Sequence, residues 1–410
     1  MSTYFDNAAT MEIDASVHPS YYSVNDRLWW RNPATFSQFS KNEELLIVDT
    51  QDSILDFIGG HPKDKIIFTS GGTESNNLAI KGWCFKKYQN THLVRNGDSG
   101  QVKSWRETPQ VFFSRIEHPS VIQPIAWLYE SGIISYYSSI AVDTCGRVCL
   151  DDLGSRLKMS SNGLPIFVSV MLANNEIGCI NDIKAISELV HKYNGVLHVD
   201  AVQAFGHMVI DVDDMGIDML SASGHKFGTP HGIGFLYIKE GIEIDPLIHG
   251  GGQQDGLRSG TESVSDIAVL NYIVLDLDVN FDVYRNNENY LRETLYEEVD
   301  KKLTGLVRWS FNTPKTDEFL PNINSLVLEG IDNEKLITLL DQLEHVQVSA
   351  GSACHAGTRE PSQVLWEIGL SEEEINNTIR ISFNRYQTAD DIRNLVDAIV
   401  RQVKNIKLIE

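Results

Sequence analysis

The chain has 410 residues and a formal net charge of −22; apolar residues make up 42% and charged residues 22%. This length exceeds what one compact core usually holds, and the composition is ordinary for a soluble globular protein, so we expect two domains. The acidity argues against nucleic acid as a direct partner, because phosphate backbones are bound by clustered Lys and Arg side chains.

The sequence carries no pattern typical of membrane insertion, export or metal binding. No apolar run approaches about eighteen residues, so we predict no membrane span. Residues 1–7 lack the basic start and apolar centre of a secretory signal. Without such a signal, an odd number of cysteines favours free thiols and a cytoplasmic location, and their spacing predicts no metal site. The cysteines are Cys84, Cys145, Cys149, Cys179 and Cys354.

Residues 65–240 predict an α/β domain, because short apolar runs alternate with helical patterns. The predicted strands, in chain order, are 65–69, 111–114, 165–172, 196–200, 219–222 and 233–237. The polar stretch 86–110 is expected to be an exposed loop. Residues 182–193 carry apolar side chains at helical spacing between two strands, as a crossover helix should. The alternation favours a largely parallel sheet.

The pattern changes after residue 262. Residues 263–305 predict two long helices, and residues 389–406 predict a final amphipathic helix. Short strands are expected between these helices, near 324–328, 346–349 and 379–383. This order of elements is typical of a smaller α+β domain.

The domain boundaries follow from this change of pattern. We expect a large domain over residues 14–262. The smaller domain comprises residues 263–410, with residues 1–13 packed against it.

A lysine ends a turn of small residues, Ser-Ala-Ser-Gly-His-Lys at 221–226, directly after the apolar stretch 217–220. A lysine held at such a turn inside a cleft can lose its proton and form a Schiff base with an aldehyde. Asp200 ends an earlier apolar run, and a carboxylate there would keep a pyridine nitrogen protonated. Lys226 and Asp200 thus meet the two requirements of pyridoxal phosphate. An isolated lysine is more often a solvated surface residue, so the prediction needs further segments.

The turn Thr-Ser-Gly-Gly-Thr-Glu-Ser-Asn-Asn at 69–77 follows a predicted strand and opens a helix. Small residues let backbone N–H groups approach a phosphate, and a helix start favours the anion. Thr73 adds a hydroxyl. Ordinary turns and helix caps use the same residue types, so this turn alone is weak evidence.

Two further polar side chains follow predicted strands. His118 can stack on a flat ring and move protons, and Asn175 offers a neutral amide to a phenolic oxygen. A structural histidine and an ordinary turn are the alternatives.

Taken with Gln203, Ser223 and His225, these segments resemble the cysteine desulfurases, in the group I (NifS/IscS-like) branch of the class V, fold-type I pyridoxal-phosphate enzymes. The similarity covers nearly the whole chain in order. Its motifs lie at 4–10, 32–33, 71–77, 117–118, 174–178, 198–203, 221–226, 249–252, 257–261, 351–354 and 379–382. The resemblance implies a large domain with a mostly parallel seven-stranded sheet, a smaller α+β domain, a homodimer and pyridoxal 5'-phosphate as cofactor.

The resemblance implies roles for the residues around the cofactor ring. Lys226 would hold the cofactor and later move protons, Asp200 would pair with the ring nitrogen, and His118 would stack on the ring. Asn175 and Gln203 would contact the phenolic oxygen.

The resemblance also implies the residues at the two ends of the site. Residues that would hold the phosphate are Thr73, Ser223 and His225, with Thr261 from a second subunit. Asn32 and Arg380 would bind the substrate carboxylate, since the planar fork of an arginine suits a carboxylate.

Cys354 lies in a segment of small residues, Ser-Ala-Gly-Ser-Ala-Cys-His-Ala-Gly at 349–357. A lone cysteine is commonly a buried core residue, but small polar neighbours argue against that here. By the resemblance, the enzyme converts L-cysteine to L-alanine, and the Cys354 thiolate takes the sulfur as a persulfide and passes it to an acceptor. The segment continues to residue 362, which is similar to group I enzymes.

The sequence leaves several alternatives open. The sulfur acceptor can be an iron–sulfur scaffold protein or a component of tRNA or DNA thiolation. A related class V lyase, epimerase or aminotransferase is a second interpretation, against which Cys354 argues, and selenocysteine lyase activity is a third. A chain that acts mainly as a docking subunit, with its persulfide delivered only inside a complex, is a fourth.

Overall fold

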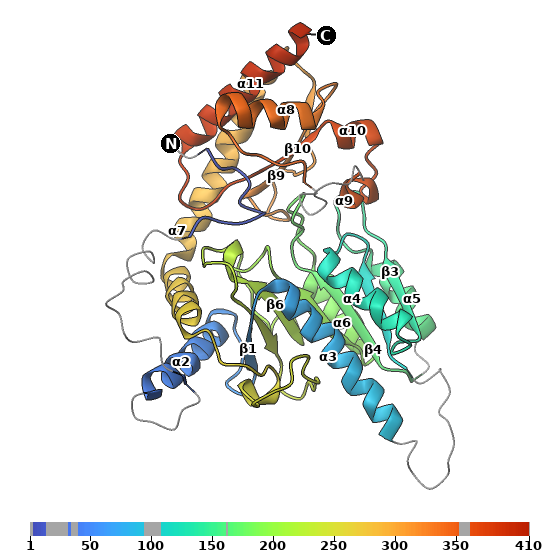
Figure 1. Cartoon of the computed structure of the whole chain (residues 1–410). Helices are drawn as coiled ribbons and strands as arrows, with labels where there is room; N and C mark the ends of the chain where they lie inside the picture. The colour runs from blue at the N-terminus through green and yellow to red at the C-terminus, as the bar shows by residue number, and fades with distance from the viewer. Residues whose placement is uncertain are drawn as a thin grey trace.

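Over the residues that it describes, the computed structural model contains two β-sheets and a long helix that runs along both of them (Figure 1). The described residues are 3–13, 32–33, 40–93, 108–160, 163–351 and 361–409.

The larger sheet has seven strands in the order β1-β7-β6-β5-β4-β2-β3. They are β1 (Lys65–Thr69), β2 (Gln110–Ser114), β3 (Tyr136–Ile140), β4 (Ile166–Met171), β5 (Val196–Asp200), β6 (Met219–Ser223) and β7 (Gly234–Ile238). Strand β7 is antiparallel to β1 and β6, and the other pairs are parallel. Every residue of β2, β4, β6 and β7 is buried, as in parallel sheets covered on both faces. The predicted α/β class and mostly parallel seven-stranded sheet are confirmed.

Helices cover this sheet. They include α2 (Lys41–Phe57), α3 (Gly72–Leu93), α4 (Pro119–Glu130), α5 (Leu150–Ser160) and α6 (Ile183–Lys192). Helix α6 is the predicted crossover between the parallel strands β4 and β5. It begins after Asp182, whose side chain accepts a hydrogen bond of 3.0 Å from the backbone N–H of Ala185.

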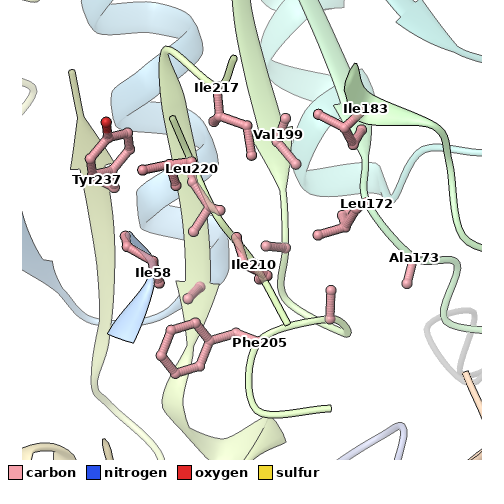
Figure 2. Close-up of a cluster of buried hydrophobic side chains, with 14 of the residues drawn as sticks. Ile58, Leu172, Ala173, Ile183, Val199, Phe205, Ile210, Ile217, Leu220 and Tyr237 are labelled. Carbon is pink, nitrogen blue, oxygen red and sulfur yellow. The ribbon is translucent and has the colours of Figure 1, made fainter. Parts of the chain in front are cut away.

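A buried apolar cluster packs against the central strands (Figure 2). The Phe205 ring lies 4.7 Å from the Phe227 ring and 5.1 Å from the Phe235 ring, measured between centroids. Because Phe227 directly follows Lys226, this aromatic packing fixes the backbone next to that lysine.

The smaller sheet has the order β10-β9-β8 and is antiparallel throughout. Its strands are β8 (Trp309–Phe311), β9 (Ile323–Leu328) and β10 (Thr378–Ser382), and the neighbouring helices are α8 (Asn333–Leu339), α9 (Gln363–Glu367), α10 (Glu372–Asn376) and α11 (Ala389–Ile409). Phe5 belongs to the buried cluster of this part, and the N-terminal residues bridge to it at Tyr4–Gln347 and Asp6–Ser382.

The prediction of two helices over 263–305 was wrong, because one helix, α7 (Val264–Leu303), spans the range (Figure 1). Polar side chains in the middle of this helix form hydrogen bonds with other parts of the chain. The Asn287 side chain donates to the carbonyl oxygens of Arg385 at 2.9 Å and Gln387 at 3.2 Å. Polar side chains within α7 therefore form tertiary hydrogen bonds.

Three other local predictions need correction. Residues 86–93, expected in a loop, continue helix α3. The expected strand at 346–349 makes isolated bridges only, at Gln347 and Ser349. Strand β3 was missed, since its first four residues are exposed or partly exposed and so lack an apolar run.

Helix α7 contributes to both cores. Its buried residues Ile267, Ile273 and Leu277 pack in the core of the large sheet, whereas Leu291 and Leu303 pack in that of the small sheet. The boundary proposed at residues 262 and 263 stays a prediction. Among the described residues, none of the helices combines the length and apolarity needed to cross a membrane.

The two-sided packing of α7 gives a test of the core. Leu277 is fully buried, and Val279, two residues later on the same helix, is 80% exposed. We expect Leu277→Ala to lower the free energy of unfolding by about 2–5 kcal/mol, through lost burial and a residual cavity. Val279→Ala should change it by less than about 0.5 kcal/mol. Urea unfolding followed by circular dichroism compares them, and equal effects would contradict this packing.

Candidate active site

A cavity of about 560 Å³ opens where strands of the large sheet end. Met171, Asp200 and Ser223 are the last residues of β4, β5 and β6, and Ser70 follows β1; all four line the cavity. Ligands of open α/β sheets bind at this edge. Most site residues predicted from the sequence also line it, namely Thr73, His118, Asn175, Asp200, Gln203, Ser223, His225, Lys226 and Arg380.

Three predicted site residues are not in this group. Cys354 lies outside the described residues. Asn32 and Thr261 are exposed and are not among the described residues that line the cavity. The segment before Thr261 is nevertheless tied to the cavity wall, because the Arg258 Nε donates to a carboxylate oxygen of Glu74 at 3.0 Å. Burial would raise the pKa of Glu74, but hydrogen bonds from Arg258 and Ser70 leave it lowered.

Lys226 ends the short helical turn η4 (Gly224–Lys226), directly after β6. A Cβ on Gly224 would lie 2.1 Å from the Thr229 hydroxyl oxygen, so this turn requires glycine. The Lys226 amine donates to the carbonyl oxygens of Ala8 at 2.7 Å and Ala9 at 2.8 Å. Two backbone acceptors from the N-terminal segment therefore hold the amine at the cavity.

Asp200 is buried, and both of its carboxylate oxygens accept hydrogen bonds. One accepts from the Asn76 side chain at 2.7 Å and the other from the Val202 backbone at 2.9 Å. Asn76 also donates to the Ser120 hydroxyl at 2.9 Å. These bonds fix the orientation of the carboxylate. Asn76 was not predicted as a site residue, although it lies in the motif 71–77, in the second turn of α3.

His118 is the N-cap of α4. Its Nδ1 accepts from the Ser120 backbone N–H at 3.1 Å, so the proton of the neutral ring resides on Nε2. The Ser120 hydroxyl lies 2.8 Å from the same Nδ1. Since Ser120 also accepts from Asn76, one hydrogen-bonded chain joins the imidazole to the Asp200 carboxylate.

Glu117 directly precedes His118 and is buried. Burial, with a smaller contribution from the Asp200 charge, raises the pKa of its carboxyl to about 8, although hydrogen bonds from Ser114 and the Met171 backbone act in the opposite direction. One oxygen accepts from Met171 N–H at 2.8 Å. Both carboxyl groups are buried and each accepts two hydrogen bonds. Those of Asp200 reach both of its oxygens, whereas those of Glu117 reach only one.

The start of α3 forms one end of the cavity. Gly71 has a φ of +143°, and a Cβ on Gly72 would lie 2.6 Å from a methyl carbon of Val202. Only glycine fits both positions, and the helix start can face an anion with its backbone N–H groups. Thr73 and Ser223 add hydroxyl groups to this end.

His225 lies at the same end. Burial lowers the pKa of its imidazole to about 4, with smaller contributions from the charges of Lys226 and His231, so the ring is neutral near pH 7. The Thr10 hydroxyl lies 3.1 Å from a ring nitrogen of each histidine. The sequence analysis identified neither Thr10 nor His231 as a site residue.

Arg380 brings the small sheet into the cavity. It lies on β10, is 2% exposed and forms an ion pair of 2.6 Å with Asp6. Its Nη1 donates to the carbonyl oxygens of Asn175 at 2.8 Å and Gly351 at 3.2 Å. Its Nε is buried and has no hydrogen-bond partner among the described residues.

These groups fit pyridoxal phosphate. The glycine turn at the start of α3 suits a phosphate, Asp200 suits a pyridinium nitrogen, and the Lys226 amine suits an aldehyde. The cavity volume lies in the range of small-molecule sites.

The buried Glu117 carboxyl predicts a pH dependence of stability. The folded chain keeps it protonated up to about pH 8, whereas an unfolded chain does so only up to about pH 4.5. The folded state therefore binds more protons between these values, and its stability falls as pH rises through this window. The midpoint of thermal unfolding of the cofactor-free protein should fall more steeply from pH 5 to 8 than in Glu117→Gln.

The control for this experiment is Glu240→Gln, at a carboxylate whose side chain is 59% exposed. It should retain the wild-type pH dependence. Parallel curves for all three proteins would show that Glu117 does not titrate in this way.

Comparisons with known proteins agree with this site. Residues 3–395 match the Aminotransferase class-V family. The chain is 34% identical over 411 residues to the cysteine desulfurase IscS of Dictyoglomus turgidum, covering 99% of this chain and 95% of that protein. A NifS-like protein from Rickettsia africae has a TM-score of 0.81 at 28% identity, covering 98% and 100% of the two chains.

A third relative is known with an amino acid bound. The structure of SspA in complex with cysteine has a TM-score of 0.74 at 29% identity, covering 94% of this chain and all of SspA. The chain belongs to the class-V aminotransferase family of pyridoxal-phosphate enzymes, and within it to the cysteine desulfurases.

Proposed function

We propose that this chain converts L-cysteine to L-alanine and passes the sulfur, through a persulfide on Cys354, to an acceptor protein. The observation that carries the proposal is the convergence of Lys226, Asp200, the glycine turn of α3 and Arg380 on one cavity. The bound cysteine of SspA, a relative at 29% identity, supports the choice of substrate.

Pyridoxal phosphate, when bound, supplies an aldehyde for the substrate amine and a ring that accepts electrons from the substrate Cα. Lys226 would bind the aldehyde and then move the proton at the substrate Cα. The Ala8 and Ala9 carbonyl groups hold its amine at the cavity. Asp200, oriented by Asn76, holds the proton on the ring nitrogen. His118 would lie against the ring face, and Asn175 and Gln203 would contact the phenolic oxygen.

The phosphate and the substrate carboxylate define the two ends of the proposed site. Thr73, Ser223 and His225 hold the phosphate at the start of α3. Arg380, assisted by Asn32, binds the carboxylate, since its Nε is a donor without a partner among the described residues.

Sulfur transfer needs a thiolate, which we assign to Cys354. The thiolate attacks the sulfur of the bound cysteine, and the bond between that sulfur and Cβ breaks. The electron pair of the broken bond stays with the carbon, which takes up a proton and leaves as L-alanine. The product on the chain is the Cys354 persulfide, whose outer sulfur an acceptor removes.

The proposal includes a homodimer in which Thr261 reaches the phosphate of the second subunit. Thr261 is exposed, and the Arg258–Glu74 pair anchors its segment beside the cavity wall. An iron–sulfur scaffold protein or a tRNA- or DNA-thiolation component is the proposed acceptor. The cysteine composition favours a cytoplasmic location.

Two variants separate cofactor capture from sulfur transfer. Lys226→Ala should lose the visible absorbance of a lysine-linked cofactor, because no other amine is held at that position. Cys354→Ala should keep this absorbance and form alanine from L-cysteine about 10³-fold or more slowly, since it lacks the nucleophile. Absorption spectra and alanine release measure both effects.

Cys149→Ala, at a half-buried thiol outside the cavity, is the matched control and should leave the rate unchanged. Wild-type alanine production by Cys354→Ala would exclude the persulfide route.

The dimer has its own test. Light scattering should give twice the chain mass, and Thr261→Ala should weaken cofactor binding about fivefold, the effect of one lost hydrogen bond of about 1 kcal/mol. A wild-type chain that is monomeric and still binds the cofactor would refute a shared phosphate site.

A further inference from the structure

His207 lies behind the catalytic lysine and faces two hydrogen-bond acceptors. It is 4% exposed, in the turns that follow β5. Its Nδ1 is 2.9 Å from a carboxylate oxygen of Glu288, on α7, and its Nε2 is 3.3 Å from the carbonyl oxygen of Lys226. A carbonyl oxygen only accepts, and so does an ionised carboxylate, so both contacts are favourable when both ring nitrogens donate.

The same helix supports this turn through a second side chain. Arg285 donates to the carbonyl oxygen of His207 at 2.7 Å. On the other side, Arg385 donates to the carbonyl oxygen of Phe227 at 3.0 Å and lies 4.8 Å above the Tyr284 ring. His207 thus contacts the carbonyl group of Lys226, and Arg385 donates to that of Phe227. His207 is in turn in contact with Glu288 on α7, and Arg385 follows β10.

These contacts matter because η4 is only three residues long and has little internal hydrogen bonding of its own. If the peptide that follows Lys226 rotated, the lysine Cα would move and carry the amine with it. A displacement of about 1 Å at a catalytic group can cost about 100-fold in rate. A donor fixed on the Lys226 carbonyl removes that freedom.

We propose that His207 is a positioning residue for Lys226, and that Glu288 holds it in place. The pair ties the backbone of the cofactor-binding lysine to α7, whose two halves pack in the two cores. The inference rests on the proposed role of Lys226 in binding the cofactor and is independent of the sulfur transfer.

The chemistry of the two contacts selects the variants. Lysine offers three donors and no acceptor, so His207→Lys can donate to both Glu288 and the Lys226 carbonyl. His207→Gln brings an amide whose oxygen cannot donate, so one of the two contacts becomes repulsive. If His207 only packed in the core, both variants would lower the free energy of unfolding and neither would change the rate at which Lys226 links the cofactor.

The experiment measures how fast the cofactor-free full-length protein links pyridoxal phosphate to Lys226, by stopped-flow absorbance without cysteine. We expect His207→Gln to slow linkage by about 10–100-fold, and His207→Lys to remain within about threefold of wild type. Alanine production from L-cysteine by the holoenzymes should follow the same order.

The control is His191→Gln, which breaks another histidine–carboxylate contact, 2.9 Å from Asp218, away from the cavity. It should lower the unfolding midpoint and leave the linkage rate unchanged. If His207→Gln does not fold, Glu288→Leu replaces it; this variant removes the acceptor that holds His207 Nδ1 and should slow linkage in the same direction.

Wild-type linkage in His207→Gln, or equal impairment in the lysine and glutamine variants, would overturn the proposal. The two proposals can fail separately. If linkage is slow in His207→Gln but the wild type releases no alanine from L-cysteine, the proposed function is refuted and the positioning role is supported.

Discussion

The hydrogen bonds from the Lys226 amine to the Ala8 and Ala9 carbonyl groups join parts of the chain that are far apart in sequence. The N-terminal segment that supplies these acceptors begins on the small sheet, where Asp6 bridges to Ser382. It ends at the large sheet, where the Met11 N–H donates to the His225 carbonyl at 2.8 Å. The amine can therefore be held at the cavity only when both sheets and this segment are in place.

The site contains two buried carboxyl groups whose different surroundings suit different tasks. Asp200 accepts hydrogen bonds on both oxygens, which stabilises a negative charge facing the cavity. Glu117 is enclosed, its second oxygen has no partner among the described residues, and its pKa is raised to about 8. A neutral Glu117 avoids a second anion next to Asp200. Glu74, which also lines the cavity, has its charge balanced by Arg258 at 3.0 Å.

Much of the large domain could be predicted because its signals are local. Apolar runs predicted six of the strands, and polar residues with suitable chemistry were recognised where several of these strands end. Asp200, His118 and Lys226 were found in this way. Asn76 and His231 were missed for a physical reason: each takes its place through a contact with a distant segment. Asn76 reaches Asp200 across two elements, and His231 meets His225 through Thr10.

The errors in the fold have a related cause. Helix α7 was predicted as two helices, but Asn287, Arg285 and Glu288 in its middle bind residues after β10 and the turns near Lys226. Strand β3 is exposed along one edge and has no apolar run. In both places, the pattern of polarity reflects what the residues contact across the fold, which the local sequence does not contain.

Arg380 joins the N-terminal segment to the chain that precedes the cysteine segment. Its buried charge is balanced by Asp6 at 2.6 Å, and its Nη1 donates to the Asn175 and Gly351 carbonyl groups. Gly351 is the last described residue before the segment that carries Cys354, and a Cβ there would lie 2.9 Å from the Glu176 carboxylate. The guanidinium thus contacts the N-terminal segment, the turn after β4 and the residue that precedes the cysteine segment. Because an unpaired buried arginine is costly, these contacts adjust together, so the positions of Asp6, Asn175 and Gly351 are properties of one network.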